Sequence, residues 1–269
     1  MRVPKPVIVA LAAGLALAVL ARTVSAEAER LDGRAVMEWL DKSQRTDSGY
    51  AEGLVTVEDK GRVREKEWRE WRLGWGAEAR SLVQFLEPAE VRGVGLLTIG
   101  HSGQADEQWF FAPAMDRHRR IARVEKSTRF LGTHFTYEDM ESADIDDHEY
   151  RRLDDDEVEG EVCYRIEARP RPETESQYSK KIFWVRQDLQ VTVRVEGYVD
   201  GTLRRTFRGS DLRRVEDVVT AHRWEVDDEK RSGLTTLVLR NVRYRLQLEE
   251  EFFSREAMRV LHSPPGTGG

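Results

Sequence analysis

Alternation of apolar and polar residues over most of the chain after Tyr50 sets the strongest limit on its fold. Short β-type runs, among them LVTVED, SLVQFLE, GVGLLTIG and QWFFAP, are separated by Gly, Asp, Pro and Lys. The second half continues the pattern with EVCYRIEARPR, SKKIFWVR and LTTLVLRNVRYRLQL. No strand-helix-strand alternation interrupts these runs. The sequence therefore predicts a long antiparallel meander and disfavours Rossmann and TIM-barrel architectures.

Three turns are predicted within the second half. The Asp200–Gly201 pair is a strong hairpin signal, because a tight turn with positive φ at both positions favours Asp-Gly. Arg231–Ser232–Gly233 and Arg186–Gln187–Asp188 are the other two predicted turns.

The run REKEWREWRLGW indicates a strand that is apolar on parts of both faces. By alternation, Trp68 lies on one face, while Trp71 and Trp75 share the other. That arrangement suits a sheet with a core on one side and a second apolar contact on the other.

Two helices are predicted. In DGRAVMEWLDKSQRT, Val36, Met37 and Leu40 form an apolar stripe at helical spacing, with Lys42 near the end where the helix dipole favours cations. A second helical segment is expected over residues 136–143, where Thr136 and Asp139 have the spacing of a capping box.

The first 26 residues have the three parts of a secretory signal peptide. Arg2 and Lys5 precede an apolar run over residues 7–20, and small residues lead to expected cleavage after Ala26. The run has about 14 residues, short of the roughly 18 to 20 that cross a bilayer as a helix. An uncleaved anchor is the alternative. An exported, soluble protein is expected, with a single domain over residues 27–262 and a disordered tail over residues 263–269.

The net charge limits the possible partners, and the cysteine content limits the possible disulfides. Loss of residues 1–26 removes three basic residues and no acid, which shifts the formal net charge from −6 to −9. Such an acidic chain has no overall attraction for nucleic acid, so anions would need a local basic patch. Cys163 is the single cysteine, which excludes an intrachain disulfide and favours a buried strand thiol.

Catalytic motifs are weak. His134 and Glu138 have a spacing that could share a metal ion with Asp139 or His118, but no HExxH doublet is present. No GxSxG motif or phosphate-binding glycine loop occurs either. The sequence therefore names no catalytic residue, metal ligand or cofactor site, and a metal-dependent hydrolase using His134, Glu138 and Asp139 is only a lesser alternative.

A basic run and the tryptophan residues are the remaining features that indicate a binding site. In a strand, three guanidinium groups of the basic run would share one face, either paired to neighbouring acids or free to hold a phosphate, a carboxylate or a protein partner. The three are Arg117, Arg119 and Arg123, and Arg120 of the same basic run completes the predicted patch from the opposite pleat. Each of the seven Trp residues is more typical of a core than of a ligand site, yet together they permit an apolar cavity inside a curved sheet.

Three stretches together resemble the family of outer membrane lipoprotein-sorting proteins, relatives of the periplasmic carrier LolA. They are EPAEVRGVGLLTIG, DEQWFFAPAMDRHRRIA and STRFLGTHFTYEDM. The matching residues are Pro88, Gly93 and Gly95; Trp109, Phe111 and Pro113; Arg117, Arg119, Arg120 and Ile121; and Phe130, Gly132, Phe135, Thr136, Tyr137, Glu138 and Asp139. Phe111 stands where the family usually has Tyr, and His134 where it more often has Asp.

The resemblance implies a mainly β fold, an unclosed antiparallel half-barrel with helices covering its concave face. It also implies a non-catalytic periplasmic carrier of lipid, acyl chains or a lipoprotein, acting with an inner-membrane exporter of the resistance-nodulation-division type and delivering toward the outer membrane. A scaffold with a filled core that docks a protein partner is the alternative. The expected cavity residues are Trp71, Trp75, Phe85, Leu97, Trp109, Phe111, Phe130, Phe135, Tyr137 and Trp184.

Four further residues of the motif have expected structural roles. Pro113 belongs to the motif, Gly132 would permit a bend where the sheet leads into a lid helix, and Asp139 would cap that helix. Glu138 is expected to pair with the upstream arginines.

Overall fold

A computed structural model describes residues 31–142 and 144–265, which fall in the unit that begins at Leu31. The unit Met1–Arg30, which contains the predicted signal peptide, lies outside the described residues, as do residues 266–269 of the predicted tail. No helix within the described part of the chain has the length and apolar character needed to cross a membrane.

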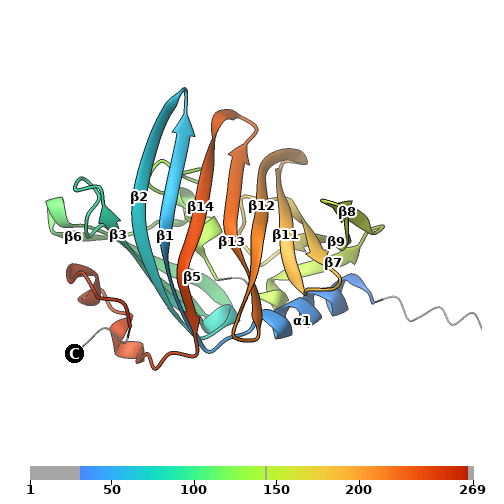
Figure 1. The fold of residues 1–269 in the computed structure, drawn as a ribbon, viewed down its shortest axis with the longest axis horizontal. Helices are drawn as coiled ribbons and strands as arrows, with labels where there is room; N and C mark the ends of the chain where they lie inside the picture. Colours follow the sequence, from blue (N-terminus) through green and yellow to red (C-terminus); the bar gives the residue numbers. More distant parts are fainter. Residues whose placement is uncertain (1–30, 143, 266–269) are drawn as a thin grey trace, which may run out of the picture. The chain divides into compact units, whose positions relative to one another are not determined.

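One antiparallel sheet of 14 strands dominates the described unit (Figure 1). The spatial order is β6-β5-β4-β3-β2-β1-β14-β13-β12-β11-β10-β9-β7, with β8 paired to β9. The strands are β1 (Ser48–Asp59), β2 (Arg62–Leu73), β3 (Arg80–Glu87), β4 (Gly95–His101), β5 (Gln104–Ala112), β6 (Arg117–Arg120), β7 (His148–Arg152), β8 (Asp156–Val158), β9 (Glu161–Pro170), β10 (Lys180–Arg186), β11 (Val191–Val199), β12 (Thr202–Val215), β13 (Val218–Asp228) and β14 (Arg231–Tyr244). The sheet is unclosed because β6 and β7 form its two edges. Most neighbouring strands follow one another in the sequence and pair antiparallel, which confirms the predicted meander.

Two of the three predicted turns are confirmed. Asp200 and Gly201 have φ of 50° and 78° between β11 and β12, and a turn over residues 187–190 joins β10 to β11. The third prediction is wrong, because β14 already begins at Arg231 and the turn occupies residues 229–230. Gly233 lies instead within the strand, where a Cβ atom would come 2.1 Å from the Glu58 carbonyl oxygen, so glycine allows this close approach.

The amino-terminal helix α1 (Gly33–Gln44) forms as predicted. Its stripe buries Val36 and Leu40, and Trp39 meets the Tyr164 ring edge-on at 5.9 Å. The helix lies against β7, β9 and β13 (Figure 1). It therefore covers one face of the sheet near the β7 edge.

Replacing the α1 cap is expected to lower stability modestly. The Asp32 carboxylate accepts a 2.8 Å hydrogen bond from the Ala35 amide, one of the unpaired donors of the first turn. Asp32→Ala should therefore lower the free energy of unfolding by about 1 kcal/mol in urea titrations. Asp32→Asn keeps the acceptor and should stay within about 0.5 kcal/mol of the parent, and equal losses in both variants would contradict the capping role.

The second predicted helix is wrong in length. Residues 136–142 contain only the 3-10 turn η4 (Glu138–Met140), and Glu141 is already extended at φ −81° and ψ 159°. Residue 143 of the predicted helix lies outside the described residues. The reciprocal Thr136 and Asp139 contacts are present, but the Asp139 carboxylate also accepts from a distant tyrosine. Side-chain contacts with distant parts of the chain therefore fix this segment, and the helix does not continue.

Six further 3-10 turns complete the described secondary structure. They are η1 (Gly76–Glu78), η2 (Pro113–Met115), η3 (Arg123–Glu125), η5 (Ile145–Asp147), η6 (Glu250–Phe252) and η7 (Ala257–Arg259). The last two belong to the segment that follows β14, shown in red in Figure 1.

Both faces of the sheet around β1 to β5 carry apolar cores, as the β2 sequence predicts. Trp68, Val83 and Leu96 belong to one core, and the neighbouring residues of opposite pleat, such as Leu82 and Leu97, belong to the other. The ladder registers place Tyr164, Phe207 and Val55 on the same face as Trp68, which we call the inner face. On the outer face, the segment after β14 contributes Phe253 and Met258 to the core.

Trp75 departs from the predicted face. It lies beyond the end of β2, and its indole nitrogen donates to the Asp41 carboxylate of α1. The predicted common face of Trp71 and Trp75 is therefore wrong, because strand alternation ends at Leu73.

Candidate functional site

A long connection between β6 and β7 covers the inner face of the sheet, and we call residues 121–142 the cover segment. Its Phe130 and Tyr137 pack on Phe85 and Trp68 from the strands, with the Phe130 and Phe85 ring centroids 5.7 Å apart. Phe135 meets the Phe207 ring of β12 at 6.0 Å. Because α1 also packs on this face, through Trp39 and Tyr164, the cover segment and the helix share one side of the sheet.

Few backbone ladder bonds hold the cover segment. Its regular backbone structure is limited to 3-10 turns and the isolated bridge between Arg129 and Thr136. The chain also bends tightly at Gly132, where φ is 75°. A segment of this kind opens at lower free energy than a strand within the sheet, since few cooperative bonds must break. Side chains must therefore fix its position.

One set of side chains, the latch network, joins the cover segment to the loop before β10. The network consists of Thr136, Glu138 and Asp139 together with Ser176, Gln177, Tyr178 and Arg205. Asp139 accepts from the Tyr178 hydroxyl at 2.8 Å, and that hydroxyl accepts from Arg205 at 3.1 Å. Burial first, and the nearby Asp139 carboxylate second, raise the pKa of Tyr178, so its hydroxyl stays protonated as a donor.

Glu138 has partners other than those expected. Its carboxylate accepts from the Ser176 hydroxyl and from the Gln177 amide at 2.9 Å. No ion pair between Glu138 and an arginine occurs within the described residues, so the expected pairing with the upstream arginines is wrong. The two bonds instead dock the cover segment onto the loop before β10.

A second anchor ties both ends of the cover segment to β5. Lys126 and Glu141 form an ion pair in which both side chains are largely buried. Lys126 also donates to the Asp106 carbonyl at 3.2 Å, and the Ser142 amide donates to the Asp106 carboxylate at 2.9 Å. Burial, with Asp106 and Glu138 as lesser causes and Lys126 opposing, raises the pKa of Glu141 to about 7.

This pKa predicts that the free energy of unfolding falls as the pH rises from about 4.5 to about 7. A folded-state pKa above the usual 4.5 means that the neutral Glu141 carboxyl is favoured in the folded state. Its stabilisation is complete below about pH 4.5 and is lost as the pH rises to about 7, with a total of about 1–3 kcal/mol.

Urea unfolding of the parent and of Glu141→Gln at pH 5 and pH 8 measures that contribution. The variant cannot ionise at this position, so its free energy of unfolding should fall less between the two pH values. An identical fall in both proteins would contradict the raised pKa.

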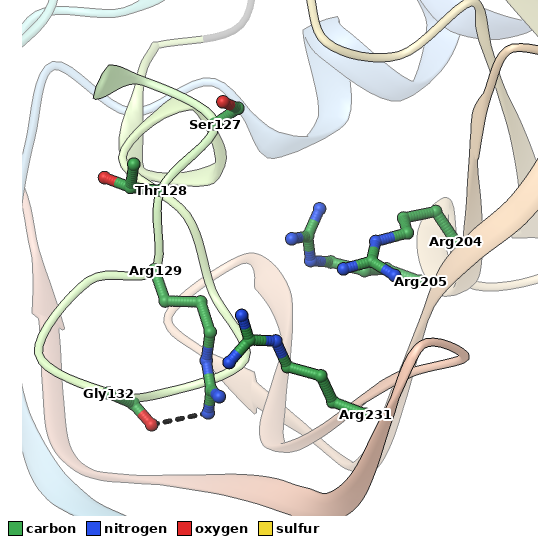
Figure 2. Close-up of a pocket in the computed structure, with 7 residues that line it drawn as sticks. All are labelled: Ser127, Thr128, Arg129, Gly132, Arg204, Arg205 and Arg231. Atoms are coloured by element: carbon green, nitrogen blue, oxygen red, sulfur yellow. Dashed lines mark hydrogen bonds between the residues drawn. The ribbon is translucent and has the colours of Figure 1, made fainter. Parts of the chain in front are cut away.

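A basic pocket opens beside the cover segment. It has a volume of ≈ 430 Å³ and is lined by Ser127, Thr128, Arg129, Gly132, Arg204, Arg205 and Arg231, which we call the arginine pocket. Figure 2 shows the guanidinium groups of Arg204 and Arg205 from β12 and of Arg231 from β14 directed toward a common space, while Arg129 of the cover segment lies beside Arg231 and is turned toward Gly132. Four cations in one pocket favour an anionic ligand.

A β-bulge explains why two consecutive arginines reach this pocket. Arg205 pairs with Gly197 and Leu203 with Tyr198, so Arg204 is an extra residue that has no partner of its own on β11. A bulge of this kind lets neighbouring side chains turn toward one side of the strand. Both contact the fully buried Asp228 carboxylate, Arg204 at 2.9 Å and Arg205 at 3.5 Å.

Comparison with known proteins assigns the family and the fold. A family model described as "-like: Uncharacterized protein" matches residues 77–260, more than half of the chain. The chain belongs to this family. Its fold is LolA-like, as the sequence resemblance implied. No curated protein matches the chain.

Three solved structures share the fold. A DUF1329 family protein from Desulfovibrio piger is 24% identical, with a TM-score of 0.81 over 84% of this chain and 97% of that one. A proposed outer membrane lipoprotein-sorting protein domain from Vibrio parahaemolyticus is 24% identical, with a TM-score of 0.80 over 85% and 98%. A LolA superfamily protein from Nitrosomonas europaea is 22% identical, with a TM-score of 0.68 over 84% and 99%.

The LolA-like sheet divides the ten predicted cavity residues between its two faces. Phe85, Phe130, Phe135 and Tyr137 meet on the inner face at the cover segment. Trp71, Leu97, Trp109 and Phe111 pack on the outer face with the segment after β14. Trp184 donates to Asp156 and lies under Arg194, and Trp75 contacts α1. The structure therefore brings four of the ten together at the cover segment and another four together on the opposite face, and the role of all ten as ligand contacts stays a prediction.

The predicted arginine patch is largely paired. Arg119 pairs with Glu125 and Arg120 with Glu107. Arg123 pairs with Glu175, and Pro113 opens the 3-10 turn that leads to Arg117. The alternative of arginines paired to neighbouring acids thus describes these three ion pairs.

His134 lies fully buried, away from a metal-binding arrangement. Its Nδ1 lies 2.8 Å from the Thr235 hydroxyl, while Glu138 and Asp139 bond within the latch network. Burial and then Arg129 lower the pKa of His134. Within residues 31–142 and 144–265, no three His, Cys, Asp or Glu side chains form a group that could hold a metal ion.

The arginine pocket could not be predicted from the sequence. Arg204 and Arg205 belong to a run that reads as an ordinary strand, and Arg231 was placed in a turn. The run RRTF over residues 204–207 is a visible signal, but only the bulge shows that both arginine side chains reach one side of the strand.

Proposed function

We propose that this chain is a periplasmic carrier that binds an acyl chain of a lipid or lipoprotein between the inner face and the cover segment. The observation that carries the proposal is that aromatic side chains of a segment with few backbone ladder bonds fill this face. Displacement of Phe130, Phe135 and Tyr137 would uncover the apolar strand residues that they now contact, such as Phe85 and Phe207. The LolA-like fold and the name of the Vibrio relative agree with this role.

The hydrophobic effect favours replacement of the cover-segment aromatics by a bound acyl chain. Burial of apolar surface contributes about 25 cal/mol per Å², so a single acyl chain supplies several kcal/mol. That gain can offset the withdrawal of the cover aromatics, because the bound chain takes over their contacts with the sheet. Binding and release need no catalytic group.

The proposal includes the expected partners and extent of the carrier. The lipid-binding domain would span residues 27–262, receive its cargo with the help of an inner-membrane exporter of the resistance-nodulation-division type, and deliver it toward the outer membrane. The signal-like sequence of residues 1–26 supports this location.

Two measurements on the exported full-length protein test the carrier function. Native mass spectrometry and lipid extraction of protein purified without detergent should detect an acyl ligand. Protein stripped of lipid should take up a fluorescent fatty acid with saturable binding. Absence of both a bound acyl ligand and uptake would overturn the proposal.

A partner-docking scaffold is the second candidate, favoured by the close packing under the cover segment. Phe130 and Phe85 are only 3% and 2% exposed and contact each other directly. A scaffold with this filled core would give no acyl ligand and no fatty-acid uptake, while hydrogen exchange at the cover segment would remain as slow as in the central strands.

A further inference from the structure

We infer that the arginine pocket binds a phosphate group, which on the proposed carrier function is the head-group phosphate of the cargo lipid. Guanidinium groups match phosphate oxygens with paired hydrogen bonds, so a cluster of arginines suits this anion better than lysines would. Free phosphate has the same chemistry, and the experiment below separates the two sources.

The charges in the pocket are not balanced by protein acids. Arg204 and Arg205 share the Asp228 carboxylate. Arg129 donates to the Gly132 carbonyl at 2.6 Å and to the Thr133 carbonyl, and neither Arg129 nor Arg231 forms an ion pair within the described residues. Two positive charges thus face the pocket without a paired acid, which fits a phosphate monoester with up to two negative charges.

Proximity of like charges supports the same conclusion. Burial, and then the nearby Arg231, lower the pKa of Arg129, while the Asp59 and Asp228 carboxylates oppose this effect. The repulsion between Arg129 and Arg231 is relieved when an anion lies between them. Figure 2 shows their guanidinium groups near each other among the residues that line the pocket.

The pocket adjoins the apolar part of the inner face. Arg205 donates to the His134 carbonyl at 3.1 Å, and the next residue of the cover segment, Phe135, meets Phe207 two positions along the same strand. A ligand with its phosphate on the arginines would therefore direct its acyl chain toward the Phe135 and Phe207 contact. The arginines and the apolar side chains would then contact the same ligand molecule.

Binding of decyl phosphate, decanol, decanoate and inorganic phosphate to the full-length protein tests the inference at constant ionic strength. The parent should bind decyl phosphate at least about tenfold more tightly than decanol. Arg231→Gln should lose most of that preference while its affinity for decanol stays unchanged. Arg213→Gln is the matched control, since Arg213 lies on β12, is exposed and pairs with Asp211.

Each outcome separates this inference from the carrier function. Equal binding of decyl phosphate by the parent and Arg231→Gln would overturn the phosphate site, and so would equal affinity of the parent for decanoate and decyl phosphate. Decanol binding that persists would leave the carrier function standing. Binding of inorganic phosphate that requires Arg231, without any decanol binding, would support the phosphate site, identify free phosphate as the ligand and overturn the carrier function.

Discussion

Arg205→Met is expected to lower the free energy of unfolding by about 3–5 kcal/mol. The guanidinium group is 3% exposed and donates to the His134 carbonyl, the Gln177 amide oxygen and the Tyr178 hydroxyl, while facing the Asp228 carboxylate. Methionine fills similar space but leaves these acceptors without a donor in a buried site. The cover segment should loosen at the same time, because the arginine links it to β12.

Arg208→Met is the matched control for this change. Arg208 lies three positions along the same strand, is 47% exposed and pairs only with Asp227 among the described residues. Loss of an exposed ion pair should cost less than about 1 kcal/mol. Urea unfolding measures both values, and similar losses in the two variants would show that the latch network contributes little to stability.

The path of the sheet was predictable because it depends on local chemistry. Alternation fixes which residues share a face, and Asp200–Gly201 fixes a hairpin at the residues that it names. The helix α1 was equally predictable from its apolar stripe and from Asp32, which supplies the cap at its start.

Tertiary contacts determine two features that local sequence patterns could not predict, the short turn after Thr136 and the arginine pocket. Thr136 and Asp139 read as the cap of a helix, yet Tyr178 and Arg205 draw the same carboxylate into the latch network and the helix stops after one turn. Similarly, alternation places Arg204 and Arg205 on opposite faces, whereas the bulge brings both into one pocket.

Face assignment limited the prediction of the binding surface. The β2 sequence indicated that both faces are apolar, but it could not indicate which core the cover segment contacts and which the segment after β14 contacts. Residues of adjacent positions, such as Phe110 and Phe111, therefore fall in different cores. The tertiary positions of the cover segment and of the segment after β14 decide what surrounds each of the two side chains.

A disulfide between the cover segment and β14 is expected to abolish acyl uptake. The His134 backbone amide and Nδ1 both lie within 2.9 Å of the Thr235 hydroxyl, so cysteines at positions 134 and 235 would face each other. If acyl chains enter by displacing the cover segment, His134→Cys with Thr235→Cys should lose at least about 90% of fluorescent fatty-acid uptake when oxidised, because a covalent link removes the open state.

Reduction of the same protein provides the internal control, since it restores the freedom of the cover segment without changing the sequence. Uptake should return on addition of dithiothreitol, and each single-cysteine variant should bind in both redox states. The natural Cys163 should not interfere, because it is fully buried and burial raises the pKa of its thiol to about 11. Full uptake by the oxidised double variant would mean that the acyl chain enters elsewhere, and the cover segment would then be a fixed part of the core.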